Sequence, residues 1–169
     1  MVLAFNLHFD DVSYNIVMGD LGKKTSWTNF SERLMILTNR GSDPLAVIFY
    51  ESGSLQPRHS VLKFLQDLFA LPATSSFFYT SDQNILIEII LRNILDLPSD
   101  SGLRTEYLQL LQAIIKNSTW CEERHKAAQL KSVLSSFAKE DAPLQPDSTS
   151  FKNRTYAKAI LDEFKQHFP

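Results

Sequence analysis

Apolar residues recur at helical spacing along most of the chain, and one segment is apolar on nearly every side. From residue 85 to 97 the aliphatic positions are Ile85, Leu86, Ile87, Ile89, Ile90, Leu91, Ile94, Leu95 and Leu97. A helix that is apolar all round has to be covered on several sides by other helices. The pattern therefore predicts that this segment is the centre of a layered helical domain, with Ile89, Ile90 and Leu110 in its core.

The same periodicity predicts helices before and after the central segment. We expect them at residues 12–21, 27–38, 43–49, 59–71, 103–116, 124–138 and from 149 or 150 to 168. The helix at 59–71 has the pattern of an amphipathic helix with one apolar face. Ser81 or Asp82 is a suitable N-cap for the central helix, and Pro98 closes it. Ser26 could cap the helix that begins with Trp27.

Helix pairs joined by short loops predict an all-α fold, an armadillo- or HEAT-like α-solenoid of stacked helices. The sequence contains no strict repeat, so the repeats are expected to be degenerate. We expect a helical-repeat domain at residues 1–140, a linker at 141–150 and a C-terminal amphipathic helix at 151–169 that packs on the domain.

Composition narrows the class of protein. The chain has 169 residues, of which 44% are hydrophobic and 21% charged, as in soluble globular proteins. A formal net charge of −2 gives no preference for nucleic acid or for an anionic membrane. Glu88 and Arg92 interrupt the central apolar run, which is too short to span a bilayer. We therefore expect a cytoplasmic protein with no nucleic-acid partner and no membrane insertion.

Candidate chemistry is sparse. Cys121 and His125 are four residues apart and would be neighbours on one helix, where a Cys–His pair could form a nucleophile. No Gly-rich oxyanion turn and no orienting acid accompanies them in the sequence. The histidines are scattered, and no metal-ligand or phosphate-loop spacing occurs. We expect no enzymatic activity, no cofactor, no metal and no small-molecule substrate.

Arginines near predicted helix ends are the better candidates for a function. Arg92 could extend from the apolar helix to solvent or pair with Glu88 one turn earlier. Arg104 lies in the first turn of its helix, where the dipole disfavours a cation. It either pairs with an acid such as Asp100 or Glu106, or faces a partner. The partner-binding candidates, chosen as exposed arginine, aromatic and adjacent positions, are Arg92, Arg104, Tyr107, Arg124 and His125.

Several short segments, taken in order, carry a family resemblance. They are NRGSDP at 39–44, HSVLKFLQDLF at 59–69, FYTSD at 78–82, RNI at 92–94, DL at 96–97, LR at 103–104, EYL at 106–108 and RH at 124–125. Their order and spacing resemble the leucine-rich C-terminal domain of the WISH/DIP family, the NCK-interacting proteins with a Src-homology-3 domain. The resemblance extends from near the N-terminus to about residue 137.

The resemblance implies an armadillo-like helical domain that binds and activates the actin-related protein 2/3 complex. In that family activation needs no pre-existing filament, so a linear filament is nucleated. Related fungal proteins act at endocytic actin patches, which implies a location at cortical actin structures. The alternative left open by the residues is a generic helical-repeat scaffold that binds a peptide or helix of another partner.

The sequence differs from the family pattern in two respects. It contains no Src-homology-3 domain and no proline-rich region, and the family domain is longer on its N-terminal side. The opening residues Val2, Leu3, Phe5 and Leu7 are apolar, with no capping residue before them. We therefore expect that an N-terminal piece of the domain is missing or is supplied by another chain.

Overall fold

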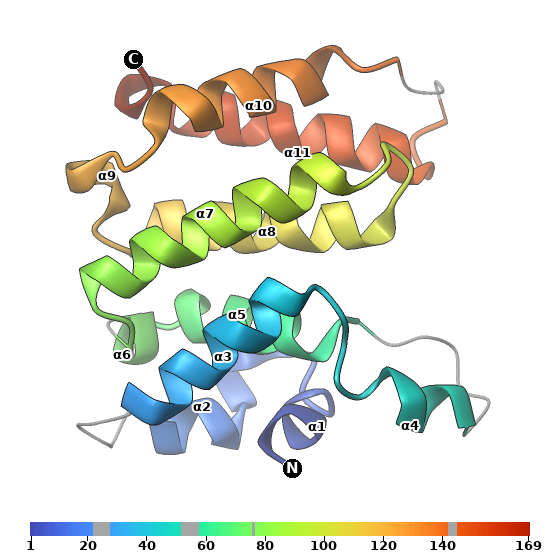
Figure 1. The fold of residues 1–169 in the computed structure, drawn as a ribbon, viewed down its shortest axis with the longest axis vertical. Helices are drawn as coiled ribbons and strands as arrows, with labels where there is room; N and C mark the ends of the chain where they lie inside the picture. The colour runs from blue at the N-terminus through green and yellow to red at the C-terminus, as the bar shows by residue number, and fades with distance from the viewer. Residues whose placement is uncertain (22–27, 52–57, 76, 142–144) are drawn as a thin grey trace.

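The computed structural model describes residues 1–21, 28–51, 58–75, 77–141 and 145–169 (Figure 1). All regular structure in these residues is helical, which confirms the predicted all-α fold. The α-helices are α1 Val2–Asn6, α2 Ile16–Leu21, α3 Thr28–Arg40, α4 Ala46–Glu51, α5 Ser60–Ala70, α6 Pro72–Ser75, α7 Thr80–Asp96, α8 Gly102–Asn117, α9 Trp120–Glu123, α10 Ala127–Lys139 and α11 Thr149–Glu163. Two 3-10 helices, Val12–Tyr14 and Lys165–His167, complete them. The expected cap Ser26 and the first residue of its helix, Trp27, lie outside the described residues.

Helix pairs are stacked in three layers, as in a solenoid (Figure 1). The layers are α3 with α5, α7 with α8, and α10 with α11, and the two helices of each pair contact each other. One row is formed by α3, α7 and α10, and the other by α5, α8 and α11, with each helix touching its neighbour in the row. The short helix α1 packs on α5 and on α2 at the N-terminal end.

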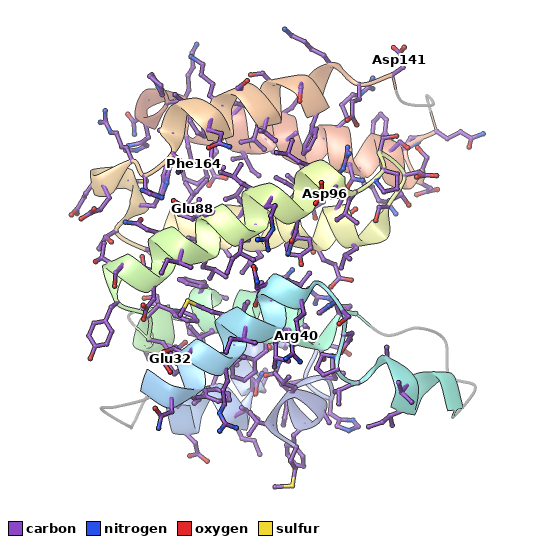
Figure 2. All side chains as sticks on the ribbon, viewed as in Figure 1. Glu32, Arg40, Glu88, Asp96, Asp141 and Phe164 are labelled. Atoms are coloured by element: carbon purple, nitrogen blue, oxygen red, sulfur yellow. The ribbon has the colours of Figure 1, made fainter. Side chains whose placement is uncertain are left out.

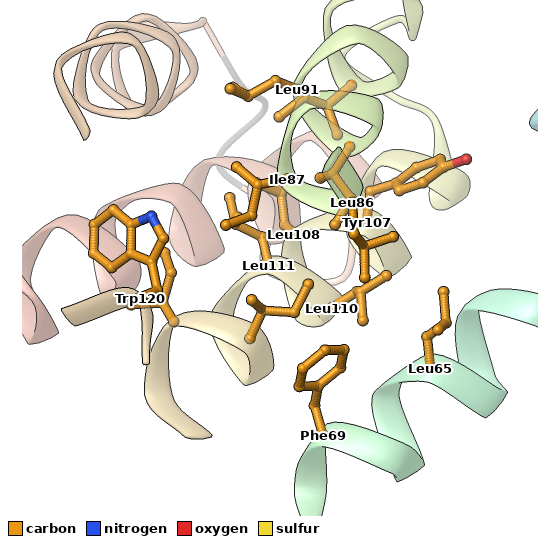
Figure 3. Packing of buried hydrophobic residues seen from close by; sticks show 14 of the residues in the cluster. Leu65, Phe69, Leu86, Ile87, Leu91, Tyr107, Leu108, Leu110, Leu111 and Trp120 are labelled. Carbon is orange, nitrogen blue, oxygen red and sulfur yellow. The ribbon is translucent and has the colours of Figure 1, made fainter. Parts of the chain in front are cut away.

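One apolar core runs through all the layers. Figure 3 shows Leu65 and Phe69 of α5 beneath Leu110 of α8, with α7 packed on the other side of α8. The predicted core residues Ile89, Ile90 and Leu110 are all buried, which confirms their placement. Burial of this kind contributes about 1.5–3 kcal/mol for each fully buried aliphatic side chain.

The most enclosed helix is α5, which is amphipathic as predicted but has its polar side buried as well. Every residue of α5 from Ser60 to Phe69 is buried, including Lys63 and Asp67. By contrast α7, predicted to be covered on several sides, exposes 48% of Ile85 and 51% of Leu95. The difference arises because α1, α3, α6 and α8 all contact α5.

Hydrogen bonds from distant segments make the burial of polar residues in α5 possible. The Nζ atom of Lys63 donates to the Phe9 carbonyl at 2.5 Å and to the Asp67 carboxylate. The same carboxylate accepts from the side-chain amides of Asn6 and Asn15, each at 3.0 Å. A buried ion pair needs such additional hydrogen bonds to offset the cost of desolvation.

Several predicted helix ends were also wrong. The N-cap of α7 is Tyr79, which makes no side-chain capping bond, and neither Ser81 nor Asp82 has that role. The helix expected from Arg124 begins instead at Ala127, because Arg124 and Lys126 have positive φ values of 54° and 56°. A residue in this left-handed region interrupts an α-helix.

Other helix boundaries also differ from the predicted ones. The segment 12–21 is divided at Asn15 into a 3-10 helix and α2. Regular helix begins at Ala46, although the Asp43 carboxylate accepts the Leu45 backbone N–H at 2.9 Å, as the expected N-cap would. Ser148 caps α11 by accepting the Phe151 N–H at 3.3 Å. This helix ends at Glu163, short of the expected residue 168.

Candidate functional site

A groove lies between α3 and α7, which run side by side on one face of the molecule (Figure 1). Its volume is about 670 Å³. The residues that line this α3–α7 groove are Glu32, Met35, Ile36, Asn39, Ile85, Glu88, Ile89 and Arg92. Ile36 is 53% exposed and Ile85 48%, so apolar surface is accessible at both walls. Figure 2 labels Glu32 on α3 and Glu88 on α7.

Donors of α7 hold the C-terminal end of α3 at one end of the groove. Arg92 donates through Nη2 to the Asn39 carbonyl at 3.3 Å and to the Asn39 side-chain oxygen. Asn93 donates to the Thr38 carbonyl at 3.0 Å and to the Tyr107 hydroxyl oxygen at 2.8 Å. The last carbonyls of a helix have no partner within it. These contacts therefore give the Thr38 and Asn39 carbonyls of α3 hydrogen-bond donors, and they fix the distance between the two groove walls.

Glu88 connects the groove to the segment before α10. Its carboxylate lies 2.9 Å from His125 Nε2 and 3.7 Å from Lys126 Nζ. The hydrogen bond with His125, aided by the charge of Lys126, holds the pKa of Glu88 below its ordinary value. Glu88 therefore pairs with these two residues, whereas Arg92 is exposed, which is the other of the two alternatives for it. Arg124, beside them, is exposed and forms the left-handed C-cap of α9.

Arg104 is buried, so the expectation that it is exposed was wrong. It is 4% exposed, and its Nη1 donates to both carboxylate oxygens of Glu140 at 2.9 and 2.8 Å. Its Nη2 donates to the Leu97 carbonyl, and the guanidinium carbon lies 4.2 Å from the centroid of the Phe137 ring. The ion-pair alternative was right, but the acid lies in the next layer and is neither Asp100 nor Glu106.

Tyr107 was also expected to be exposed, and the structure places it in the core at 1% exposure. Its hydroxyl accepts the hydrogen bond from Asn93, and burial raises the pKa of Tyr107 above its ordinary value. Of the five predicted site residues, Arg92, Arg124 and His125 thus remain accessible beside the groove, while Arg104 and Tyr107 are internal.

Cys121 and His125 are not neighbours on one helix, because α9 ends at Glu123. The thiol of Cys121 donates to the Ile115 carbonyl at 3.4 Å, and burial raises the pKa of Cys121. The His125 ring is directed to Glu88 instead. In the ranges that the structure describes, no group of three or more His, Cys, Asp and Glu residues is placed to hold a metal ion. None of the described helices combines the length and apolar character needed to cross a bilayer.

A polar joint between α5, α8 and the α3–α4 loop was missed by the sequence analysis. The His59 backbone N–H donates to Glu106 Oε2 at 3.0 Å, and the Ser60 N–H donates to Asp43 Oδ2 at 2.8 Å. Burial lowers the pKa of His59 and raises the pKa of Glu106. Burial also acts to raise the pKa of Asp43, but hydrogen bonds from Ser60 and Leu45 outweigh it and lower that pKa.

The segments that carry the family resemblance meet in these contacts. Segments 39–44, 59–69 and 106–108 form the polar joint, and segment 92–94 joins α7 to α3. Residues 1–130 match the family described as "SPIN90/Ldb17, leucine-rich domain". The chain belongs to this family. The match confirms the resemblance inferred from the short segments, and α11 lies beyond the matched part of the leucine-rich domain.

A curated relative adds a second comparison. The chain is 39% identical over 90 residues to protein dip1 of Schizosaccharomyces pombe. The aligned part is 53% of this chain and 21% of dip1. The chain thus matches about a fifth of the length of that relative.

Proposed function

We propose that this chain is a non-enzymatic regulator of the actin cytoskeleton that binds and activates the actin-related protein 2/3 complex. It nucleates linear actin filaments without a pre-existing filament and acts in the cytoplasm at cortical actin structures, including those of endocytosis. The observation that carries the proposal is the family match over residues 1–130, which spans the first two helix layers and the start of the third.

Activation then follows from differential affinity. A ligand shifts a two-state equilibrium only if it binds one state more tightly. A shift from 1:99 to 99:1 requires about 10⁴-fold tighter binding to the favoured state. A stiff surface suits this task, because it loses affinity when the partner subunits take the wrong arrangement. Side-chain hydrogen bonds between the helix layers support this stiffness, such as those of Arg104 with Glu140 and of Asn93 with the Thr38 carbonyl.

The proposed contact face contains the accessible candidates Arg92, Arg124 and His125 beside the α3–α7 groove. Arginine is enriched at protein interfaces, and its planar fork can bind carboxylates through two hydrogen bonds. Arg104 and Tyr107 contribute indirectly in this proposal, by holding α8 against α10 and α7.

Actin assembly with the purified complex tests the proposal. The chain is expected to bind the complex and to shorten the lag of actin polymerisation when no preformed filaments are added. Arg92→Glu and Arg124→Glu are expected to weaken both effects, whereas Lys158→Glu, an exposed change on α11, serves as the matched control. If the parent chain neither binds the complex nor changes the lag, the proposal is rejected, and a generic helical-repeat scaffold takes its place.

A further inference from the structure

The α3–α7 groove gathers apolar surface that the fold itself leaves uncovered. Met35 and the largely buried Ile89 contribute to its lining, and the side chains of Ile36 and Ile85 are about half exposed. Single exposed apolar residues are ordinary on protein surfaces, and here two of them face one groove, where a single partner segment can cover both. A volume of about 670 Å³ is enough for several side chains of a partner.

The groove has a negative charge toward one end and a positive charge toward the other. Helices α3 and α7 run in the same direction, because the end of α3 at Thr38 and Asn39 meets Asn93 and Arg92 near the end of α7. Glu32 therefore lies toward the N-terminal end of the groove and Arg92 toward its C-terminal end. The carboxylate of Glu88 already lies against His125 and Lys126.

Of the charged residues that line the groove, Arg92 and Glu32 are the two with no ion pair to another described residue. Asn39, the hydrogen-bond partner of Arg92, is neutral and leaves the positive charge of the guanidinium uncompensated. Glu32 is exposed in the first turns of α3. A complementary partner therefore carries a basic side chain at one end of the contact and an acidic side chain at the other.

Both walls of the groove are α-helices, whose backbone groups are hydrogen-bonded within each helix. They offer no sheet edge to which an extended peptide could add as a strand. An α-helix brings its own backbone hydrogen bonds and can lie in the groove without any from the walls. Its apolar residues at positions i, i+3 or i+4, and i+7 would then enter the groove side by side.

We propose that the α3–α7 groove binds one amphipathic α-helix of the actin-related protein 2/3 complex, with a basic residue of that helix against Glu32 and an acidic residue against Arg92. This inference rests on the proposed function. The apolar stripe of the bound helix covers Ile36 and Ile85, and the two end charges set the direction in which the helix lies.

Site-specific photocrosslinking to the purified complex tests where the helix lies. Benzoylphenylalanine at position 36 or 85 is expected to crosslink to one helical segment that carries a basic residue. Position 47 on α4, where Val47 is 66% exposed, serves as the control and is expected to give no such product. A complex that binds but crosslinks through a loop or strand, or only from position 47, overturns the groove inference and leaves the proposed function intact. A complex that does not bind at all rejects both.

Binding measurements on surface variants separate the apolar and charged parts. Ile36→Asp and Ile85→Asp are each expected to weaken binding at least tenfold, whereas Val47→Asp leaves it unchanged. Glu32→Lys is expected to weaken binding several-fold and to reduce its dependence on salt. All of these positions are exposed, so the melting temperature should stay within error of the parent. Parent-like affinity in both isoleucine variants would overturn the inference.

Discussion

Replacing Arg104 by Ala tests whether this arginine holds the layers together or faces a partner. The change removes two hydrogen bonds to Glu140, the residue that follows α10, and one to the carbonyl of Leu97, the residue that follows α7. It also removes the contact with the Phe137 ring. Because Arg104 is only 4% exposed, water replaces few of these contacts while the rest of the fold stays intact. The expected result is a loss of stability.

The size of the loss follows from three contributions. The Leu97 carbonyl left without its donor costs about 1 kcal/mol or more. The contact with the ring contributes about 1 kcal/mol. The ion pair adds about 1 kcal/mol and not the 3–5 kcal/mol of a fully buried pair, because the Glu140 side chain is 32% exposed and is hydrated when released. Together they predict a loss of about 3 kcal/mol, or a melting temperature lower by about 6–12 °C for a chain of this size.

Thermal and urea denaturation measure this loss of stability. The control is Arg33→Ala, a change at an exposed position of α3. Its free energy of unfolding should stay within about 0.5 kcal/mol of the parent value. Charge reversal by Arg104→Glu should lower stability further, while the fraction that remains folded binds any partner normally. A parent-like melting temperature for Arg104→Ala would refute the reasoning. Normal stability with lost binding would make Arg104 an interface residue.

The remaining predictions concern the core, a cap and a buried histidine. Ile90→Ala and Leu110→Ala, at fully buried positions, should each cost about 2–5 kcal/mol in urea denaturation, and parent-like midpoints for both would contradict the packing of α7 on α8. Ser148→Ala should cost about 1 kcal/mol, whereas Asp82→Ala, which removes no capping bond, should cost only a few tenths; equal melting temperatures for the two variants would argue against this assignment. Burial lowers the pKa of His59 from an ordinary value of 6.5, so the unfolded chain takes up a proton first as the pH falls, and stability declines below pH 6.5. His59→Asn retains a capping side chain without the titration, so urea midpoints at about pH 7.5 and 5.5 should differ less in this variant than in the parent; an equal difference would show that other groups cause the decline.

Helix existence and fold class could be predicted from the sequence because both depend on local spacing. Leu86, Ile90 and Ile94 recur at about the period of one turn, which places them on one face of a helix that other helices can cover. The short loops between such segments placed successive helices side by side. The resemblance carried by the short ordered segments was also a property of the sequence alone, and the family match supports it.

Helix ends and burial were less predictable. The spacing of apolar residues shows which face of a helix avoids water, but it does not show how many neighbours the helix has. Lys63 and Asp67 on the polar side of α5 predicted an exposed face, and only the approach of Asn6, Asn15 and the Phe9 carbonyl allows both charges to be buried. The left-handed backbone at Arg124 and Lys126, which sets the start of α10, has no signal in these residue types.

The candidate site was decided mostly by tertiary structure. The sequence singled out Arg92, Arg124 and His125, which remain accessible, but it also selected Arg104, whose carboxylate partner lies 36 residues away in Glu140. No local pattern shows that α3 and α7 leave a groove between them, because these two helices are about 50 residues apart in the sequence and meet only in the folded chain. Local periodicity thus determined that this protein is a stack of helices. The long-range contacts decided which charged side chains the stack buries and which surface it leaves open, since both depend on groups that meet only in the folded chain.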